Sequence, residues 1–273
     1  MSFRIALWLV TAFFGLISVS QLGAHIFENR IQDHTKVTNE QYDPRMSELD
    51  NIDKLVQYID SITELKELGP HRAQEHVLLI DDVLRMRFYH GVSYISFADN
   101  ALANLAGNLL WEDFKAGVTS EEILKHHHAL CSQSAIVFQE ISRRYGYDVR
   151  AIGLKNHFCS EVLYDGSWHL IDSDFEPIFD ISKPIPCVND LADNPELTRD
   201  AYKNVQDKRF LNSLDQQFVH VKKYNVNEFP AMKMRIFQLS TFYAGRYLWI
   251  PLLFVSLLVE KRHRSGAMSK VIA

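Results

Sequence analysis

The chain has 273 residues, of which 47% are hydrophobic, 12% aromatic and 23% charged, and its formal net charge at pH 7 is −5. This composition is typical of a folded globular protein and excludes a disordered or collagen-like chain. The small acidic excess leaves no surplus of cations to neutralise phosphates, so we expect no nucleic-acid partner. Three cysteines are too few for a disulfide scaffold.

The N-terminal segment is apolar on all sides. The run from Ile5 to Phe27 contains no Asp, Glu, Lys or Arg and follows the basic residue Arg4. A membrane span needs roughly 20 such residues, so residues 1–27 could form a transmembrane anchor, although a secretory signal peptide has the same pattern. Residues 18–20 (Ser-Val-Ser) do not match the Ala-x-Ala pattern of a strong cleavage site, which favours an uncleaved anchor.

Residues 28–70 are predicted to form a linker followed by an amphipathic helix. Apolar side chains recur at spacings of three and four from Leu49 to Ile62, and the pair Gly69–Pro70 ends the pattern. The stripe is shorter than three heptads, so packing against the domain is a better explanation than a coiled coil. Two further helices are predicted, at residues 72–87 and 99–110.

A helix, a strand and a β-hairpin are predicted between residues 131 and 174. Cys131 opens the helix, which ends at Tyr145–Gly146 because glycine fits the left-handed C-terminal position. A strand follows, and two more strands flank Asp165–Gly166, a dipeptide that strongly favours a two-residue hairpin loop. Residues 71–235 are therefore expected to form one α+β domain.

A second apolar segment, residues 236–260, precedes a basic tail at residues 261–273. The segment is long enough to span a membrane, but it contains Arg246, which costs roughly 2.5–3.5 kcal/mol at mid-membrane. Aromatic residues beside Arg246 could form an interfacial belt, so a second transmembrane helix is preferred to an amphipathic helix on the surface. The signal-like N-terminus places the domain outside the cytoplasm, in the periplasm of a Gram-negative cell.

Three chemically active side chains occur in order: Cys131 at a helix start, His157 opening one hairpin strand, and Asp172 closing the other. A helix N-terminus stabilises a thiolate, and its backbone N–H groups can hold an oxyanion. If Asp165–Gly166 forms the loop, counting back along both strands makes Asp172 the diagonal neighbour of His157 on one face. This order predicts a nucleophile, a base and a residue that orients the base.

This stretch resembles the transglutaminase-like superfamily, a papain-like cysteine acyl-transfer fold, in its bacterial membrane-anchored form. The resemblance covers roughly residues 75–180 and is carried by CSQSAIVFQEISRRYGYDVRAIGL followed by NHFCSEVLYDGSWHLID. It implies a core in which a helix that bears the cysteine packs on an antiparallel sheet. It also implies that Cys131 is the nucleophile, His157 the base and Asp172 the orienting acid.

The resemblance implies an enzyme that acts on amide bonds of a peptide or protein through a thioester on Cys131. His157 would deprotonate the thiol and later protonate the leaving amine. The thioester would pass to water in a peptidase or amidase, or to an amine in a transamidase. The alternative is a catalytically inactive papain-like domain that binds peptides or glycans in the cell envelope.

Three other side chains are candidates to support this triad. Glu161 and Asp174 are predicted on the hairpin face that carries His157, and the resemblance gives Glu161 a family position. His128 precedes Cys131 closely and could position it. A solvated strand charge is an equal explanation for Glu161.

Residues 126–128 (His-His-His) raise the question of a metal site. Consecutive histidines on a helix point in different directions, so at most two could share one ion. No metal ion or other cofactor is predicted. Cys159 and Cys187 could pair in an oxidising compartment, which would leave Cys131 as a free thiol.

Overall fold

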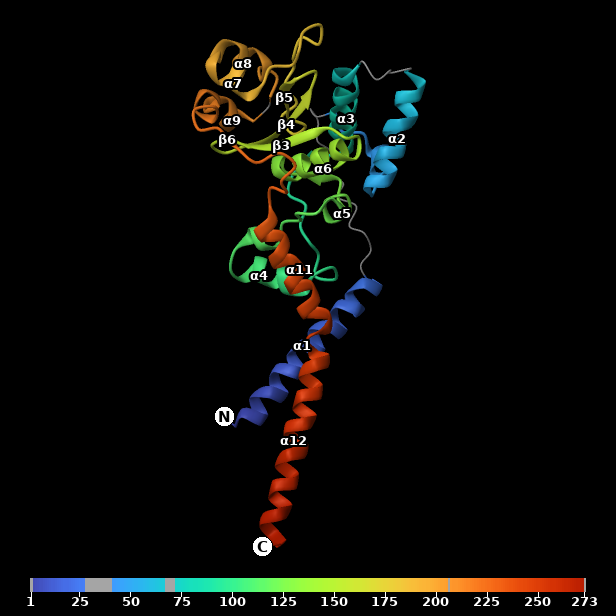
Figure 1. Cartoon of the computed structure of the whole chain (residues 1–273), viewed down its shortest axis with the longest axis vertical. Helices are drawn as coiled ribbons and strands as arrows, with labels where there is room; N and C mark the ends of the chain where they lie inside the picture. Colours follow the sequence, from blue (N-terminus) through green and yellow to red (C-terminus); the bar gives the residue numbers. More distant parts are fainter. Residues whose placement is uncertain (1, 28–40, 67–71, 206, 273) are drawn as a thin grey trace. The chain divides into compact units, whose positions relative to one another are not determined.

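A computed structural model describes residues 2–27, 41–66, 72–205 and 207–272 of the chain (Figure 1). Helices and an antiparallel sheet are combined in it, as the α+β expectation requires. Close contacts divide the chain into two compact units. The larger unit is Asp33–Tyr94 with Gly117–Ala231, and the smaller unit is Met1–Gln32, Ile95–Ala116 and Met232–Ala273.

The larger unit is built on a four-stranded antiparallel sheet with strand order β5–β4–β3–β6. The strands are β3 (Asp148–Gly153), β4 (Phe158–Tyr164), β5 (Ser167–Ile171) and β6 (Lys222–Lys223). Helix α6 (Cys131–Arg144) packs on one face, where the Gln139 amide donates to the Ser160 hydroxyl at 3.0 Å. Gly146 follows α6 with φ of +81°, which confirms the predicted glycine-terminated helix.

The hairpin of β4 and β5 has the predicted register. Asp165 and Gly166 have φ values of 49° and 78°, the left-handed pair of a tight two-residue loop. Tyr164 therefore pairs with Ser167. Side chains then alternate between the faces of the sheet.

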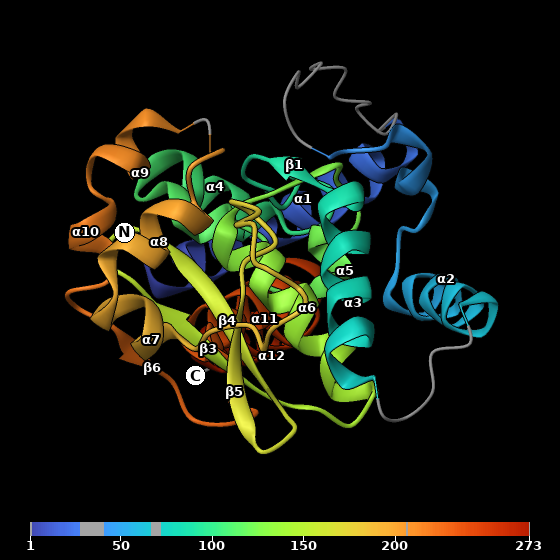
Figure 2. The same ribbon diagram turned by 90° about the horizontal axis from the view of Figure 1, so that it is seen from above.

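Two helices cover the outer side of α6. Helix α3 (Ala73–Arg87) packs on α6, and α2 (Ile52–Leu65) packs on α3, as Figure 2 shows from above. The side chain of Asn51 caps α2 by accepting from the Lys54 N–H, and Ile52, Leu55 and Ile59 are buried, which confirms the predicted amphipathic helix. Most of the linker predicted at residues 28–44, namely residues 28–40, and the Gly69–Pro70 stop lie outside the described residues.

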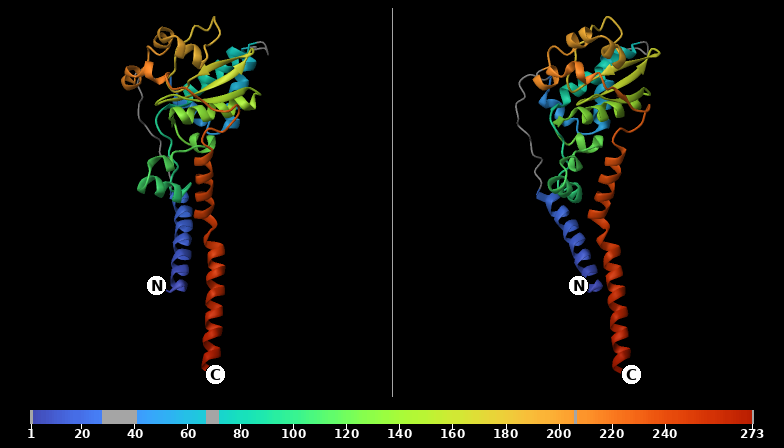
Figure 3. Two further views of the ribbon diagram at one scale, coloured as in Figure 1. Left: turned by 60° about the vertical axis from the view of Figure 1, so that its left-hand side comes forward. Right: turned by 90° about the vertical axis from the view of Figure 1, so that its left-hand side faces the viewer.

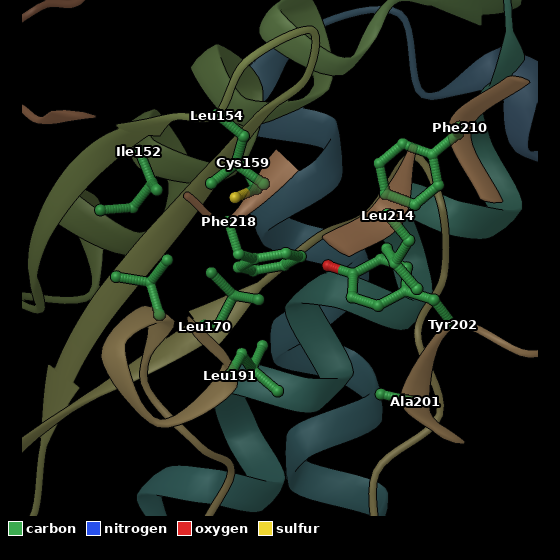
Figure 4. Packing of buried hydrophobic residues seen from close by; sticks show 11 residues of the cluster. Ile152, Leu154, Cys159, Leu170, Leu191, Ala201, Tyr202, Phe210, Leu214 and Phe218 are labelled. Carbon is green, nitrogen blue, oxygen red and sulfur yellow. The ribbon is translucent and has the colours of Figure 1, made fainter. Parts of the chain in front are cut away.

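Short helices cover the opposite face of the sheet. They are α7 (Val188–Asp193), α8 (Pro195–Ala201), α9 (Lys208–Asn212) and α10 (Leu214–Gln217). Cys159 and Leu170 from the sheet pack there against Tyr202, Phe210 and Phe218 (Figure 4). The three cysteines all lie in the described part of the chain and are free. The suggested pairing of Cys159 with Cys187 was therefore wrong: Cys159 is buried in this apolar cluster, while Cys187 caps α7.

A pair of two-residue strands lies next to the start of α6. Strand β1 (Tyr89–His90) runs parallel to β2 (His128–Ala129), with His90 opposite Ala129. The short helix α5 (Ser120–Ile123) comes before β2, and the Thr119 hydroxyl caps it. The histidine run therefore leads into a strand rather than lying on a helix.

The smaller unit combines three segments that are far apart in the sequence. They supply α1 (Phe3–Phe27), α4 (Ala101–Leu109), the 3₁₀ turn η2 (Glu112–Lys115), α11 (Met232–Tyr247) and α12 (Trp249–Ile272). The predicted helix at 99–110 corresponds to α4 and joins the terminal helices: the Asn100 amide donates to the Gln238 carbonyl and the Thr241 hydroxyl, at 2.8 and 3.0 Å.

Helix α1 is long and apolar enough over Phe3–Ala24 to cross a membrane. It lies beside α12, where the Thr11 and Ser256 hydroxyls are 3.0 Å apart (Figure 3). The C-terminal segment differs from the single helix expected at 236–260. Helices α11 and α12 meet at a bend of 49°, and only the two together pass the same test. Pro251 explains the break because it has no N–H to donate to the carbonyl of Tyr247.

Candidate active site

The predicted base and its orienting acid are in direct contact. The distance from His157 Nε2 to Asp172 Oδ2 is 2.7 Å, and each side chain is only 1% exposed. His157 immediately precedes β4 and Asp172 immediately follows β5, so the hairpin register is what brings them together. The diagonal relationship expected from the loop is thus present.

Asp172 is held by a second set of donors. The Tyr202 hydroxyl donates to Oδ2 at 3.0 Å, and the backbone N–H groups of Asp174 and Phe175 donate to Oδ1 at 3.3 and 3.2 Å. Burial opposes ionisation, but the charge of His157 and these hydrogen bonds outweigh it and lower the pKa of Asp172. The carboxylate is therefore fixed in position and charged.

Aromatic side chains pack around the His157 ring and exclude water from it. Its ring centroid is 4.4 Å from that of Phe175 and 5.4 Å from that of Phe210. Burial disfavours the imidazolium, but the charge of Asp172 and the hydrogen bond to it prevail and raise the pKa of His157 to about 10. At neutral pH the ring is thus protonated and ready to act as an acid toward a leaving group.

Cys131 is the first residue of α6 and is half-buried. Leu130, at the N-cap, has no side-chain acceptor, so the first N–H groups of α6 receive no cap from it and are suited to an oxyanion. The buried Gln133 fixes this end of the helix: Oε1 accepts from the Leu130 N–H at 3.1 Å, and Nε2 donates to the Ser93 and Gly117 carbonyls, both at 2.8 Å.

Asp174 is the supporting candidate that the fold brings to the site. One ligand atom each from Cys131, His157 and Asp174 lie within 4.8 Å of one another. The Asp174 side chain is 2% exposed, and its Oδ1 is 2.8 Å from His90 Nδ1. Burial raises the pKa of Asp174. A second histidine–aspartate pair therefore lies beside the first.

Glu161 and His128, the other two candidates, have different surroundings. Glu161 is buried; it forms a 2.6 Å ion pair with Arg150 and accepts from the Val188 N–H at 2.7 Å, so it ties β3 and β4 to the start of α7. The His128 ring packs on Tyr89, with ring centroids 5.5 Å apart. Among the described residues, neither joins the cluster around Cys131.

Sequence reasoning missed three residues that shape this site: His90, Phe175 and Tyr202. His90 comes from a two-residue strand, which has no periodicity to detect. Tyr202 follows α8 in a region without a recognisable motif. Phe175 alone had a signal, because an aromatic residue closely following the orienting acid is well placed to cover the histidine.

A cavity of about 330 Å³ reaches Asp172. It lies between α3 and residues 170–185, and Asp81, Arg85 and Asp172 contribute to its wall. Asp81 and Arg85 form a buried ion pair at 2.6 Å there. Among the described residues, its lining includes neither Cys131 nor His157. Of the three residues predicted as a triad, the cavity therefore borders Asp172 alone.

Comparison of the chain with protein-family models, with curated proteins and with solved structures finds no match. What the structure itself establishes is a mixed helix and sheet fold, a buried His157–Asp172 pair and Cys131 close to it. Function is therefore inferred from this geometry and from its chemistry.

Proposed function

We propose that the larger unit is a cysteine acyl-transfer enzyme acting on amide bonds, with a papain-like arrangement of Cys131, His157 and Asp172. One observation carries the proposal: a buried imidazole bonded to a carboxylate at 2.7 Å lies within 4.8 Å of a thiol at a helix N-terminus. Cysteine nucleophiles need an activating base and a group that orients the base, and these residues supply both.

The two ring nitrogens of His157 have separate roles. Nε2 is bonded to Asp172, which leaves Nδ1 to face the thiol. Cys131 Sγ, with its proton already on His157 Nδ1, attacks the amide carbonyl carbon, and backbone N–H groups at the start of α6 stabilise the oxyanion. His157 then protonates the leaving amine, the C–N bond breaks and a thioester forms.

The second half of the reaction regenerates the thiol. His157, now neutral, takes a proton from water or from a primary amine, and the resulting nucleophile displaces Cys131 from the thioester. Water as acceptor makes the protein a peptidase or amidase, and an amine makes it a transamidase. The mass of the acyl product, measured with and without added primary amine, separates these two reactions.

The proposed enzyme is anchored in a membrane. Helix α1 supports this because it is long, apolar and largely exposed, with Leu9, Leu16 and Val19 each more than half exposed. The bent pair of α11 and α12 is the second span. The signal-like N-terminus favours an extracytoplasmic, periplasmic location for the larger unit.

Labelling with a thiol-directed amide probe tests the catalytic proposal. A peptide carrying a chloromethyl ketone should label the full-length protein in detergent at Cys131 and lose that labelling in Cys131→Ala. Cys187→Ala is the matched control because Cys187 is also half-buried and free, and it should label like the parent. Equal labelling of Cys131→Ala and the parent would contradict the proposal.

A non-catalytic peptide- or glycan-binding protein is the second candidate. The observation in its favour is that the His157 side chain is only 1% exposed and that the 330 Å³ cavity reaches Asp172 instead of Cys131. This candidate requires that Cys131→Ala keep full function in cells. Loss of function in that variant, with normal expression and membrane localisation, would exclude it.

A further inference from the structure

We propose that Cys131, His157 and Asp174 form a binding site for a divalent transition-metal ion of the Zn²⁺ type, and that the bound ion blocks the nucleophile reversibly. The blocking effect rests on the proposed function, but metal binding does not. The site differs from the histidine run at residues 126–128, which is the metal candidate visible in the sequence.

The chemistry and spacing of the three side chains suit such an ion. A thiolate sulfur, an imidazole nitrogen and a carboxylate oxygen are the ligand types that Zn²⁺ takes in proteins, and three protein ligands leave its fourth position open. Their ligand atoms already lie within 4.8 Å of one another. A tetrahedral site would require these atoms to move closer together through side-chain rotation.

Asp174 Oδ2 is buried and has no hydrogen-bond partner among the described residues. His157 Nδ1 is buried beside the Cys131 thiol and makes no hydrogen bond of normal geometry among the described residues. A buried polar atom without a partner costs roughly 1–3 kcal/mol. The alternative atoms are occupied, since His157 Nε2 is bonded to Asp172 and Asp174 Oδ1 to His90. A metal ion bound by His157 Nδ1, Asp174 Oδ2 and the thiolate would satisfy both of these atoms at once.

The neighbouring residues already hold the ligands as a metal site requires. Metal-binding histidines commonly donate their other ring nitrogen to a carboxylate, which fixes the ring, and ligating carboxylates are themselves hydrogen-bonded. Asp172 does this for His157, and His90 does it for Asp174, at 2.7 and 2.8 Å. This second pair has no role in the acyl-transfer steps and is explained by the metal site.

Cobalt titration of the full-length protein in detergent tests the site directly. We expect one Co²⁺ per chain, with a thiolate-to-cobalt charge-transfer band that Zn²⁺ displaces. Cys131→Ser should lose the band, and Cys187→Ser should keep it. Asp174→Asn should weaken binding by at least the roughly 10–100-fold that loss of an outer-shell partner costs, while Asp180→Asn, at an exposed carboxylate, should bind like the parent.

The outcomes separate this inference from the proposed function. No cobalt band in a folded parent, or unchanged affinity in Asp174→Asn, overturns the metal site even if the protein cleaves amides. A band that depends on Cys131 and Asp174 supports the site even if no amide is cleaved. The melting temperature of Asp174→Asn without metal checks its folding, and if that variant does not fold, Asp174→Glu should retain the band with altered affinity.

Discussion

The hydrogen bond between His157 and Asp172 joins two side chains that water hardly reaches, each being 1% exposed. In such surroundings two charges stabilise each other strongly, but either one alone is costly because the bulk solvent cannot replace its partner. The Tyr202 hydroxyl and two backbone N–H groups donate the remaining hydrogen bonds to the Asp172 carboxylate. Removing either partner would therefore leave a buried charge without its counter-charge at the ends of the hairpin.

Removing the carboxylate should destabilise the larger unit. We expect Asp172→Ala to lower the free energy of unfolding by about 3–5 kcal/mol, because His157 is left as a buried charge without a counter-charge. Chemical denaturation followed by circular dichroism measures the change. Asp180→Ala, at an exposed carboxylate, should leave the midpoint where it is, and a similarly small change for Asp172→Ala would contradict the prediction.

The raised pKa of His157 gives stability a defined pH dependence. The ordinary pKa of a histidine is 6.5 and the pKa of His157 in the fold is about 10, so the folded state binds the proton more tightly than the unfolded state. The resulting stabilisation is complete below pH 6.5 and is lost as the pH rises through 10. The difference in melting temperature between the parent and His157→Gln should therefore become smaller at alkaline pH. A difference in melting temperature that becomes larger as the pH rises would show that His157 is neutral in the folded protein.

At the scale of elements, the hairpin was predictable because its loop chemistry is unambiguous. Asp165 and Gly166 favour the left-handed conformation, the loop fixes the register, and the register alone brings Asp172 beside His157. The partnership of Asp174 with His90 was not predictable, because it depends on strands of two residues that carry no hydrophobic periodicity.

The packing of α4 was likewise hidden from sequence reasoning. Its helical pattern was recognisable, but its hydrogen-bond partners on α11 follow more than a hundred residues later. The bend between α11 and α12 did have a signal in the sequence: Pro251 lies inside the apolar segment that was expected to be one helix. Local rules therefore gave the helices, and long-range packing decided which unit each helix joined.

The turn between α4 and η2 exposes a run of apolar side chains. Leu109, Leu110 and Trp111 are 76%, 79% and 55% exposed. The turn belongs to the same unit as α1, and Trp111 packs on Phe114, which in turn contacts Phe237 of α11, with ring centroids 5.3 and 4.6 Å apart. Exposed apolar surface of this kind, beside candidate membrane helices, is expected to contact lipid.

A fluorescent label tests the lipid contact. In a Cys131→Ser/Cys187→Ser background, an environment-sensitive probe at Leu110→Cys should shift to shorter wavelength in phospholipid vesicles and be quenched by lipid-borne quenchers. The same probe at Val226→Cys, a position 47% exposed in the larger unit, should do neither. Identical spectra from the two positions would mean that the turn at residues 109–111 stays in water.

At the scale of the whole molecule, both ends of the chain contribute to one helical unit. Arg4 near the start of α1 forms an ion pair with Glu260 of α12 at 2.8 Å. Further along the same two helices, the hydroxyls of Thr11 and Ser256 are 3.0 Å apart. These polar contacts between two otherwise apolar helices fix their relative register, since an unpaired polar group facing lipid is unfavourable. The two ends are therefore expected to lie on the same side of the membrane.

Protease accessibility tests this arrangement in spheroplasts of an expressing bacterium. With both termini in the cytoplasm, external protease should digest the larger unit and spare a tag placed after Ala273. Digestion of the tag together with the larger unit would mean that α11 and α12 do not cross, because the chain would then pass through the membrane only at α1. If the larger unit is protected and only the tag is digested, both termini face outward and the orientation is the reverse of the one expected.

Arg246 lies next to the bend between α11 and α12, and its guanidinium is 4.3 Å from the Phe242 ring centroid. The substitution Arg246→Leu should leave the tag undigested, because it removes the only charged side chain of residues 236–259, the apolar part of the α11–α12 pair.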